Sequence, residues 1–314
     1  MGTMIQKHKF GEEDFRGEKF KDHPRPLKGD NDLLSVTKPE IILDIHRQYL
    51  KAGADLITTN TFNANRISQS DYGMEDQVYE MNFQSARLAL RAIEEFEASG
   101  EKGSHFIVGT LGPTNRTASM SSDVNDPGSR SVTFDQLAEA YKEQAKALVD
   151  GGADILLVET IFDVLNAKAA LFGIKTLFDE IRTNLPVMVS GTITDASGRT
   201  LTGQTLEAFL ISVSHFPLFS VGLNCALGAE QLRPFVEELS AKAGFWVSAH
   251  PNAGLPNQFG EYDQSAEFMS AIAEDFMKEG WVNIIGGCCG TTPRHIRMIA
   301  EKAKKYPPRR KPEI

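Results

Sequence analysis

The sequence of 314 residues has few cysteines, no long apolar run and no excess of positive charge. Three cysteines are too few for a disulfide framework. No stretch approaches the roughly 18 apolar residues of a membrane span, and the N-terminus lacks an apolar signal core. Lys and Arg number 33 against 42 Asp and Glu, and this net charge of −9 disfavours nucleic acid as a partner. We therefore expect a cytoplasmic chain with no membrane and no nucleic-acid partner.

Short apolar runs rich in β-branched residues recur along the chain. They are almost continuously apolar, which is typical of strands covered on both faces in a parallel sheet. The strand-like runs are 55–59, 106–111, 154–159, 186–191, 220–224, 245–250 and 282–286.

Amphipathic helical patterns alternate with these runs. They span 38–50, 76–98, 134–149, 164–182, 205–214, 229–242, 265–279 and 293–305. Every helix except the first follows a strand, and eight βα units form a TIM barrel. The sequence therefore predicts an α/β fold, a (β/α)8 TIM barrel whose first strand is truncated at the N-terminus. An open doubly wound sheet is the alternative, but no glycine-rich dinucleotide fingerprint follows an early strand.

We expect one barrel domain over residues 1–314. Within it, residues 7–37 are charged and contain two prolines, which favours an arm around the barrel, with a mobile arm as the alternative. The long polar segment 112–132 is a candidate functional loop. Residues 306–314 are predicted to begin an interdomain linker.

All three cysteines fall at predicted carboxyl ends of strands, where TIM barrels place their active sites. Cys225 follows one strand, and Cys288 and Cys289 follow another. Three thiolates with an open fourth position are typical of a catalytic zinc site. Two alternatives stay open at this point: small buried apolar residues, and a phosphate-binding loop formed by the glycines around the cysteine pair.

The other predicted strand ends carry polar side chains. Asn60 is a candidate substrate contact. Glu159 ends a very apolar strand, so its carboxylate needs a partner, either a substrate amino group or an internal salt bridge. No lysine lies at a strand end, which disfavours Schiff-base chemistry. We therefore expect no catalytic side chain beyond the zinc site.

Two cysteine motifs, GLNCALG (222–228) and GGCCGTTPRHI (286–296), resemble the homocysteine S-methyltransferase family. Further phrases at 15–35, 59–65, 109–117, 154–171 and 250–263 resemble its cobalamin-dependent methionine synthase branch, in the N-terminal homocysteine-binding domain. The resemblance covers almost the whole chain and implies a methyltransferase acting in methionine biosynthesis.

The resemblance also implies roles for individual residues. Cys225, Cys288 and Cys289 would bind zinc, and the homocysteine thiolate would take the fourth position. Asn252 matches a position near the metal, and Glu159 matches a residue that binds the substrate amino group. The backbone of Gly2 and Thr3 matches the end of a first-strand motif that contacts the substrate carboxylate.

Zinc deprotonates a thiol that is mostly protonated at neutral pH, and the resulting sulfur attacks a methyl group. The resemblance implies methylcobalamin as the donor, carried by another module, with cobalamin-binding and folate-binding modules as partners. The family motif reads Asp-Gly-Ala-Met-Gly-Thr, whereas this chain starts at Met-Gly-Thr, so the enzyme is expected to be incomplete on its own. The alternatives are a stand-alone methyltransferase using betaine or S-methylmethionine, and a non-catalytic fragment that serves as a docking module.

Overall fold

The structure is a computed structural model that describes residues 1–101, 103–194, 197–258 and 262–312. Strands and helices alternate along it from residue 39 onward. The strands are β1 (Leu56–Thr58), β2 (Phe106–Leu111), β3 (Ile155–Ile161), β4 (Val187–Gly191), β5 (Ser220–Gly228), β6 (Trp246–Asn252) and β7 (Ile284–Ile285). The α-helices are α1 (Gly2–Ile5), α2 (Glu12–Arg16), α3 (Leu34–Thr37), α4 (Pro39–Lys51), α5 (Arg66–Gln69), α6 (Val78–Ala98), α7 (Phe134–Gly151), α8 (Val164–Ile181), α9 (Leu206–Val213), α10 (Ala229–Lys242), α11 (Ala266–Lys278) and α12 (Pro293–Ala303).

The seven strands form one sheet in the order β1-β2-β3-β4-β5-β6-β7. The pairs β1–β2, β4–β5, β5–β6 and β6–β7 are parallel, and a helix follows every strand. This repeated strand–helix unit confirms the predicted α/β fold of the TIM-barrel type. Among the described residues no strand precedes β1, and Gly2 and Thr3 lie in the short helix α1.

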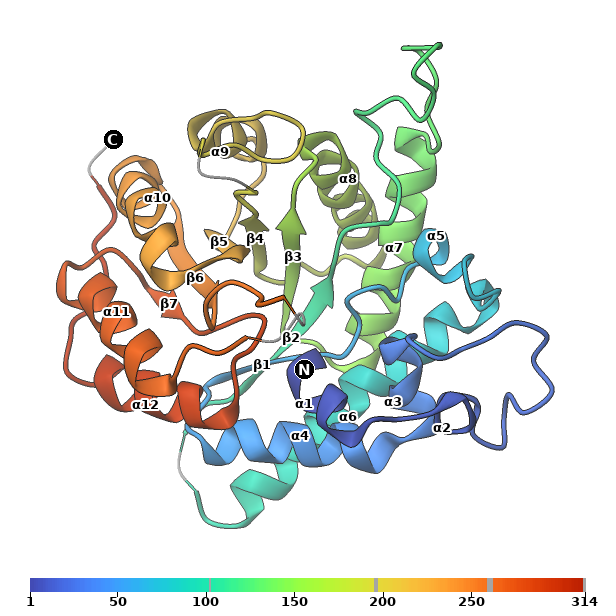
Figure 1. Cartoon of the computed structure of the whole chain (residues 1–314), viewed down its shortest axis with the longest axis horizontal. Coiled ribbons are helices and arrows are strands. Elements are labelled where there is room, and N and C mark those ends of the chain that lie inside the picture. The colour runs from blue at the N-terminus through green and yellow to red at the C-terminus, as the bar shows by residue number, and fades with distance from the viewer. Residues whose placement is uncertain (102, 195–196, 259–261, 313–314) are drawn as a thin grey trace. The chain divides into compact units, whose positions relative to one another are not determined.

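The chain divides into two compact units. The first contains residues 1–51, 55–157 and 165–185, and the second contains 52–54, 158–164 and 186–314. In the first unit α4 and α7 both pack on α6, with Leu43, Met81 and Tyr141 buried on these helices (Figure 1). None of the described helices combines the length and apolar character needed to cross a membrane.

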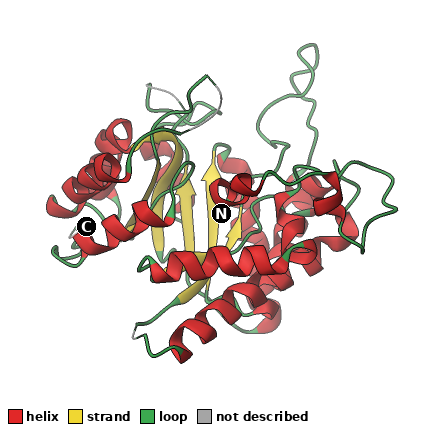
Figure 2. Ribbon diagram, turned by 60° about the horizontal axis from the view of Figure 1, so that its bottom comes forward, coloured by secondary structure: helices red, strands yellow, loops and turns green. Residues whose placement is uncertain are grey.

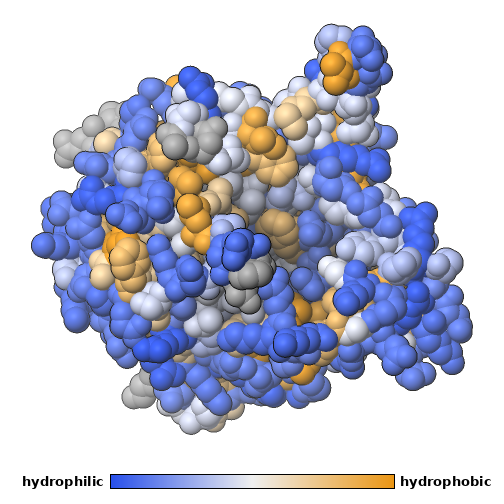
Figure 3. Space-filling view, in the orientation of Figure 1, coloured by the Kyte–Doolittle hydropathy of each residue, from blue (hydrophilic) through white to orange (hydrophobic). Residues whose placement is uncertain are grey.

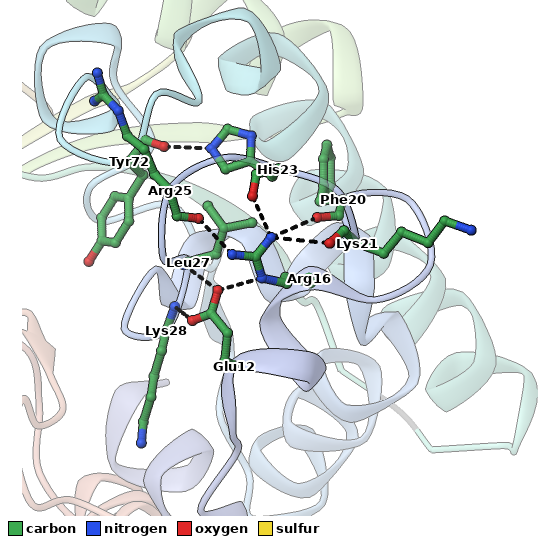
Figure 4. A network of polar contacts seen from close by, with 9 residues as sticks. All are labelled: Glu12, Arg16, Phe20, Lys21, His23, Arg25, Leu27, Lys28 and Tyr72. Carbon is green, nitrogen blue, oxygen red and sulfur yellow. Dashed lines mark hydrogen bonds and ion pairs between the residues drawn. The ribbon is translucent and has the colours of Figure 1, made fainter.

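The segment expected to form a charged arm is folded in the first unit and contains α2 and α3. The Arg16 guanidinium donates to four carbonyl oxygens, of residues 20, 21, 23 and 25 (Figure 4). Glu12 accepts hydrogen bonds from Arg16 and from the amides of Leu27 and Lys28. His23 Nε2 lies 2.8 Å from the carbonyl oxygen of Tyr72, so the loop is tied to the segment after α5.

The polar loop 112–132 of the first unit extends away from the helices (Figures 1 and 2). Figure 3 shows a hydrophilic surface on it with an apolar patch at its tip. Val124 in this loop is 97% exposed.

In the second unit α10 packs on β5 and β6, α9 and α11 pack on α10, and α12 packs on α11. The interior includes Val247 on β6 together with Phe209 and Phe276 on two of these helices. Arg309, in the last described segment, is 2% exposed and donates to the carbonyl oxygens of residues 240, 243 and 245. The segment predicted to begin a linker is therefore held against this unit at Arg309, and its last residues 313–314 lie outside the described residues.

Candidate metal and substrate site

The three cysteine side chains meet in the second unit. Cys225 lies on β5, and Cys288 and Cys289 lie in the loop between β7 and α12. Their three sulfur atoms lie within 4.8 Å of one another, and the Sγ atoms of Cys225 and Cys289 are 3.7 Å apart. All three are free, half-buried thiols. The prediction that distant strand ends bring these cysteines together is confirmed.

This sulfur arrangement fits a tetrahedral metal ion. Sulfur ligands placed about 2.3 Å from a tetrahedral zinc lie about 3.8 Å from one another. The 3.7 Å separation of Cys225 and Cys289 matches that value. Thiolates are also soft ligands, which bind zinc in preference to magnesium or calcium. The residues present therefore fit a zinc ion with three protein ligands.

The backbone of β5 has an irregular conformation at Cys225, beside the other two cysteines. The β5–β6 pairing shifts register between Asn224 and Gly228, as in a β-bulge. Cys225 and Ala226 have φ angles of 62° and 54°, in the left-handed region, as does Thr160 at the end of β3, with 56°. Each such residue costs about 1–2 kcal/mol. Strained residues from two strands therefore gather at the site.

The end of β6 fixes the cysteine pair through the backbone. The amide of Cys288 donates to the carbonyl oxygen of Pro251 at 2.8 Å, and the amide of Cys289 donates to Asn252 Oδ1 at 3.0 Å. Because these amides are already bonded within the fold, they are not available to a phosphate group. This argues against the phosphate-loop alternative. Asn252 thus lies beside Cys289, and its contact with substrate or metal stays a prediction.

Hydrogen bonds among the three thiols give them different pKa values. Bonds from Cys225 and Cys288 lower the pKa of Cys289 to about 3, and the Tyr262 hydroxyl adds to this effect. The same network and burial raise the pKa of Cys288. Without a metal the cluster therefore carries its first negative charge on Cys289. A cation would have to replace protons to bind all three thiolates.

Glu159 lies at the carboxyl end of β3, as predicted, and is half-buried. Burial raises the pKa of its carboxyl group to about 7, and negative charge on Cys289 contributes to the rise. A half-buried carboxylate near a thiolate provides a favourable position for an ammonium group. Its role as a substrate anchor stays a prediction.

The other predicted substrate contacts belong to the first unit. Gly2 and Thr3 lie in helix α1, and Asn60 follows β1. Asn60 is 5% exposed, and its Nδ2 donates to the carbonyl oxygen of Asn31 at 2.7 Å, so its amide ties the arm to the end of β1. The structure places all three residues in the first unit, and their contacts with substrate stay predictions.

Two residues at the site were not given roles by the sequence. Asn224 precedes Cys225 and is fully buried. Tyr262 packs on a cluster containing Ala253 and Met269, and a Cβ at Gly290 would lie 2.3 Å from the Cβ of Tyr262. Asn224 lies inside the motif that carries Cys225, and Tyr262 lies inside the phrase 250–263, but the spacing of residues does not encode polar contacts between such segments.

Comparisons with known proteins identify the family and a similar fold. The family model for homocysteine S-methyltransferase matches residues 1–303. The metallated form of the homocysteine methyltransferase MmuM from Escherichia coli has a TM-score of 0.73 at 20% identity, covering 96% of this chain and 93% of that chain. Its oxidized form has a TM-score of 0.72 at 20% identity, with 97% and 93% covered. A B12-independent methionine synthase from Shewanella sp. W3-18-1, in complex with selenomethionine, has a TM-score of 0.49 at 13% identity, with 89% and 90% covered.

The MmuM structures, at this level of identity, support the fold. The family model covers nearly the whole chain, including both cysteine motifs. The chain therefore belongs to the homocysteine S-methyltransferase family, and the family resemblance predicted from its motifs is confirmed.

Proposed function

We propose that the chain is the homocysteine-binding module of a methionine synthase that uses zinc and methylcobalamin. The observation that carries the proposal is the cluster of Cys225, Cys288 and Cys289, with sulfur atoms within 4.8 Å of one another. The phrases at 15–35 and 250–263, which resemble the cobalamin-dependent branch, support the choice of donor. Reduced thiols at such a site favour a reducing compartment such as the cytoplasm.

Each side chain has a definite task in this scheme. The three thiolates would hold zinc, which supplies the Lewis acid that keeps the homocysteine thiol deprotonated at neutral pH. The combined negative charge of the three thiolates is larger than the positive charge of Zn²⁺, so the substrate sulfur retains electron density for attack. The Glu159 carboxylate binds the substrate ammonium group and orients the amino acid, and Asn252 holds the Cys289 backbone in place.

Methyl transfer itself is a displacement at carbon. The homocysteine sulfur forms a bond to the methyl carbon while the bond between that carbon and its donor breaks. The bonding electrons stay with the donor, and methionine leaves the site. Cobalamin-binding and folate-binding modules would supply and regenerate methylcobalamin.

A donor assay tests the proposal. Protein loaded with zinc is incubated with L-homocysteine and methylcobalamin, S-methylmethionine or betaine, and methionine is measured by mass spectrometry. We expect methionine from methylcobalamin and none from the Cys225→Ala variant. Transfer from S-methylmethionine or betaine alone would assign the chain to the stand-alone enzymes. Zinc binding without transfer from any donor would favour a docking module.

A further inference from the structure

Asn224 has a side chain that contacts three other segments of the second unit. It lies on β5 directly before Cys225 and is fully buried. Its Nδ2 donates to Thr160 Oγ1 at 2.7 Å and to Cys288 Sγ at 3.9 Å. Its Oδ1 accepts from the amide of Thr160 at 3.0 Å and from Ser190 Oγ at 2.7 Å. The Asn224 amide therefore links the ends of β3 and β4 to the cysteine loop.

The hydrogen bonds fix which way this amide points. The backbone N–H of Thr160 is only a donor, so the atom facing it must be the oxygen of Asn224. The NH₂ group then faces Thr160 Oγ1 and Cys288 Sγ. With two donated and two accepted bonds, the amide has used its main hydrogen-bonding capacity. If the amide were flipped, its NH₂ group would face the backbone N–H of Thr160, donor against donor, and this excludes the flipped orientation.

These contacts join the two halves of the proposed site. Thr160 directly follows Glu159 and has a left-handed φ of 56°. Thr160 is held in this conformation by two hydrogen bonds with the Asn224 amide, one accepted by Oδ1 and one donated by Nδ2, and these bonds set the direction of the strand end that carries Glu159. The same NH₂ group meets the sulfur of Cys288, so a shift at either contact is transmitted to the other.

We propose that Asn224 is a positioning residue that orients the Cys288 thiolate toward the metal and aligns it with Glu159. This inference rests on the proposed zinc site. An N–H donor directed at a thiolate fixes the direction of its lone pairs and disperses part of its charge. Residues that orient metal ligands in this way typically change metal affinity by about 10-fold to 100-fold when they are replaced.

Asn224→Asp is the sharpest variant because it keeps the shape and the Oδ1 acceptor. The Thr160 hydroxyl can rotate and donate to the new carboxylate, whereas the sulfur of Cys288 loses its donor. Asn224→Ser removes the donor without adding charge and serves if the aspartate variant folds poorly. Ser190→Ala is the matched control because it removes one bond to Asn224 on the oxygen side only.

The experiment measures zinc affinity by competition with a chromophoric chelator, together with the thiolate-to-cobalt absorption band of the Co²⁺-substituted protein. We expect Asn224→Asp and Asn224→Ser to bind zinc about 10-fold to 100-fold more weakly, with a displaced cobalt band. Ser190→Ala should stay within about threefold of the wild type, since it leaves the Asn224 Nδ2 contact with the Cys288 sulfur in place. The KM for homocysteine should rise in both Asn224 variants.

The outcomes separate this inference from the proposed function. If the wild type binds no zinc, the proposed function fails and the inference fails with it. If the wild type binds zinc, and folded Asn224 variants bind it equally well with an unchanged cobalt band, the positioning role is wrong while the zinc site stands. Equal losses in the Asn224 variants and Ser190→Ala would also overturn it, since they would indicate a purely structural role.

Discussion

Among single residues, Glu159 is the side chain on which substrate recognition depends in the proposed function. Its carboxyl group is half-buried at the end of β3, near the thiol cluster. A hydrogen bond between charged partners contributes about 1.5–3 kcal/mol, and each 1.4 kcal/mol corresponds to about tenfold in affinity.

Glu159→Gln keeps the shape of the side chain but removes its charge. We expect the KM for homocysteine to rise about 10-fold to 100-fold because the substrate ammonium loses its counter-ion, while zinc per chain stays unchanged. Steady-state kinetics checks this, with the exposed Glu207→Gln on α9 as the control. An unchanged KM in Glu159→Gln would show that the carboxylate does not bind substrate.

A second buried carboxyl group gives the first unit a pH-dependent stability. Asp30 is 2% exposed, and its Oδ1 accepts from Gln69 Nε2 at 3.0 Å. Within the described part of the chain, Asp30 Oδ2 and Gln69 Oε1 have no hydrogen-bond partner. Burial raises the pKa of Asp30 from 3.8 to about 6. The folded state therefore binds a proton more tightly than the unfolded state, and this contribution to stability is lost as the pH rises from 4 through about 6.

Asp30→Asn removes the buried charge and keeps an oxygen that can accept from Gln69 Nε2. At pH 8 the variant should be more stable than the wild type, by up to about 3 kcal/mol if the full pKa shift is recovered. At pH 4, where Asp30 is protonated in the folded state, the two should differ little. Urea denaturation at both pH values measures this, with the exposed Asp22→Asn as the control. An equal difference at both pH values would contradict the assignment of this pKa.

The residues of the thiol cluster were predictable, but the residues that position them were not. Cys225, Cys288 and Cys289 lie at strand ends, and parallel strands bring their carboxyl ends to one edge of a sheet. The hydrogen bonds of Asn224 and the packing of Tyr262 depend on side-chain contacts between segments far apart in the chain. Periodicity and spacing carry no information about such contacts.

At the level of elements, close approach of β5 and β6 sets the geometry of the site. Gly222 pairs with Ser248, and a Cβ at Gly222 would lie 2.0 Å from Ser248 Oγ and 2.4 Å from Ser248 O. The hydroxyl could move, but the backbone oxygen could not without separating the strands. Glycine at this position therefore lets the strand with Cys225 pair closely with the strand that ends in Asn252.

Gly222→Ala should lower the free energy of unfolding by about 3 kcal/mol, the upper end of the usual cost of overpacking. It should also weaken zinc binding because both strands carry the site. Chemical denaturation and chelator competition measure the two effects. Gly128→Ala, in the exposed loop after β2, is the control, since its Cβ meets only Asp126 Oδ1 at 3.3 Å. A Gly222→Ala protein as stable as the control would refute the close-approach argument.

Regular elements were predicted well because their apolar periods are strong. All seven strands and eight long helices of the described residues lie where the sequence placed them, and Thr133 starts α7 with a capping box that includes Gln136. The short helices α2 and α3 were not predicted, because the charged arm has no apolar period. Its fold depends on Arg16 binding successive carbonyl groups, which composition does not reveal (Figure 4).

At the level of the whole molecule, the second compact unit contains every residue of the thiol cluster and its hydrogen-bond network. The ends of β3, β5 and β6 and the loop after β7 all belong to it. The fold class followed from counting strands and helices in order. The division of the chain into two units could not be predicted in this way, because it depends on how densely the elements pack rather than on their order.

Zinc content measures the central claim most directly. The chain is purified under reducing conditions, and zinc per chain is determined by plasma mass spectrometry for the wild type and for Cys225→Ala. The account predicts about one zinc per wild-type chain and little in the variant, because three thiolates from distant segments form one site. A wild-type chain that holds no zinc even after the metal is added back would contradict it.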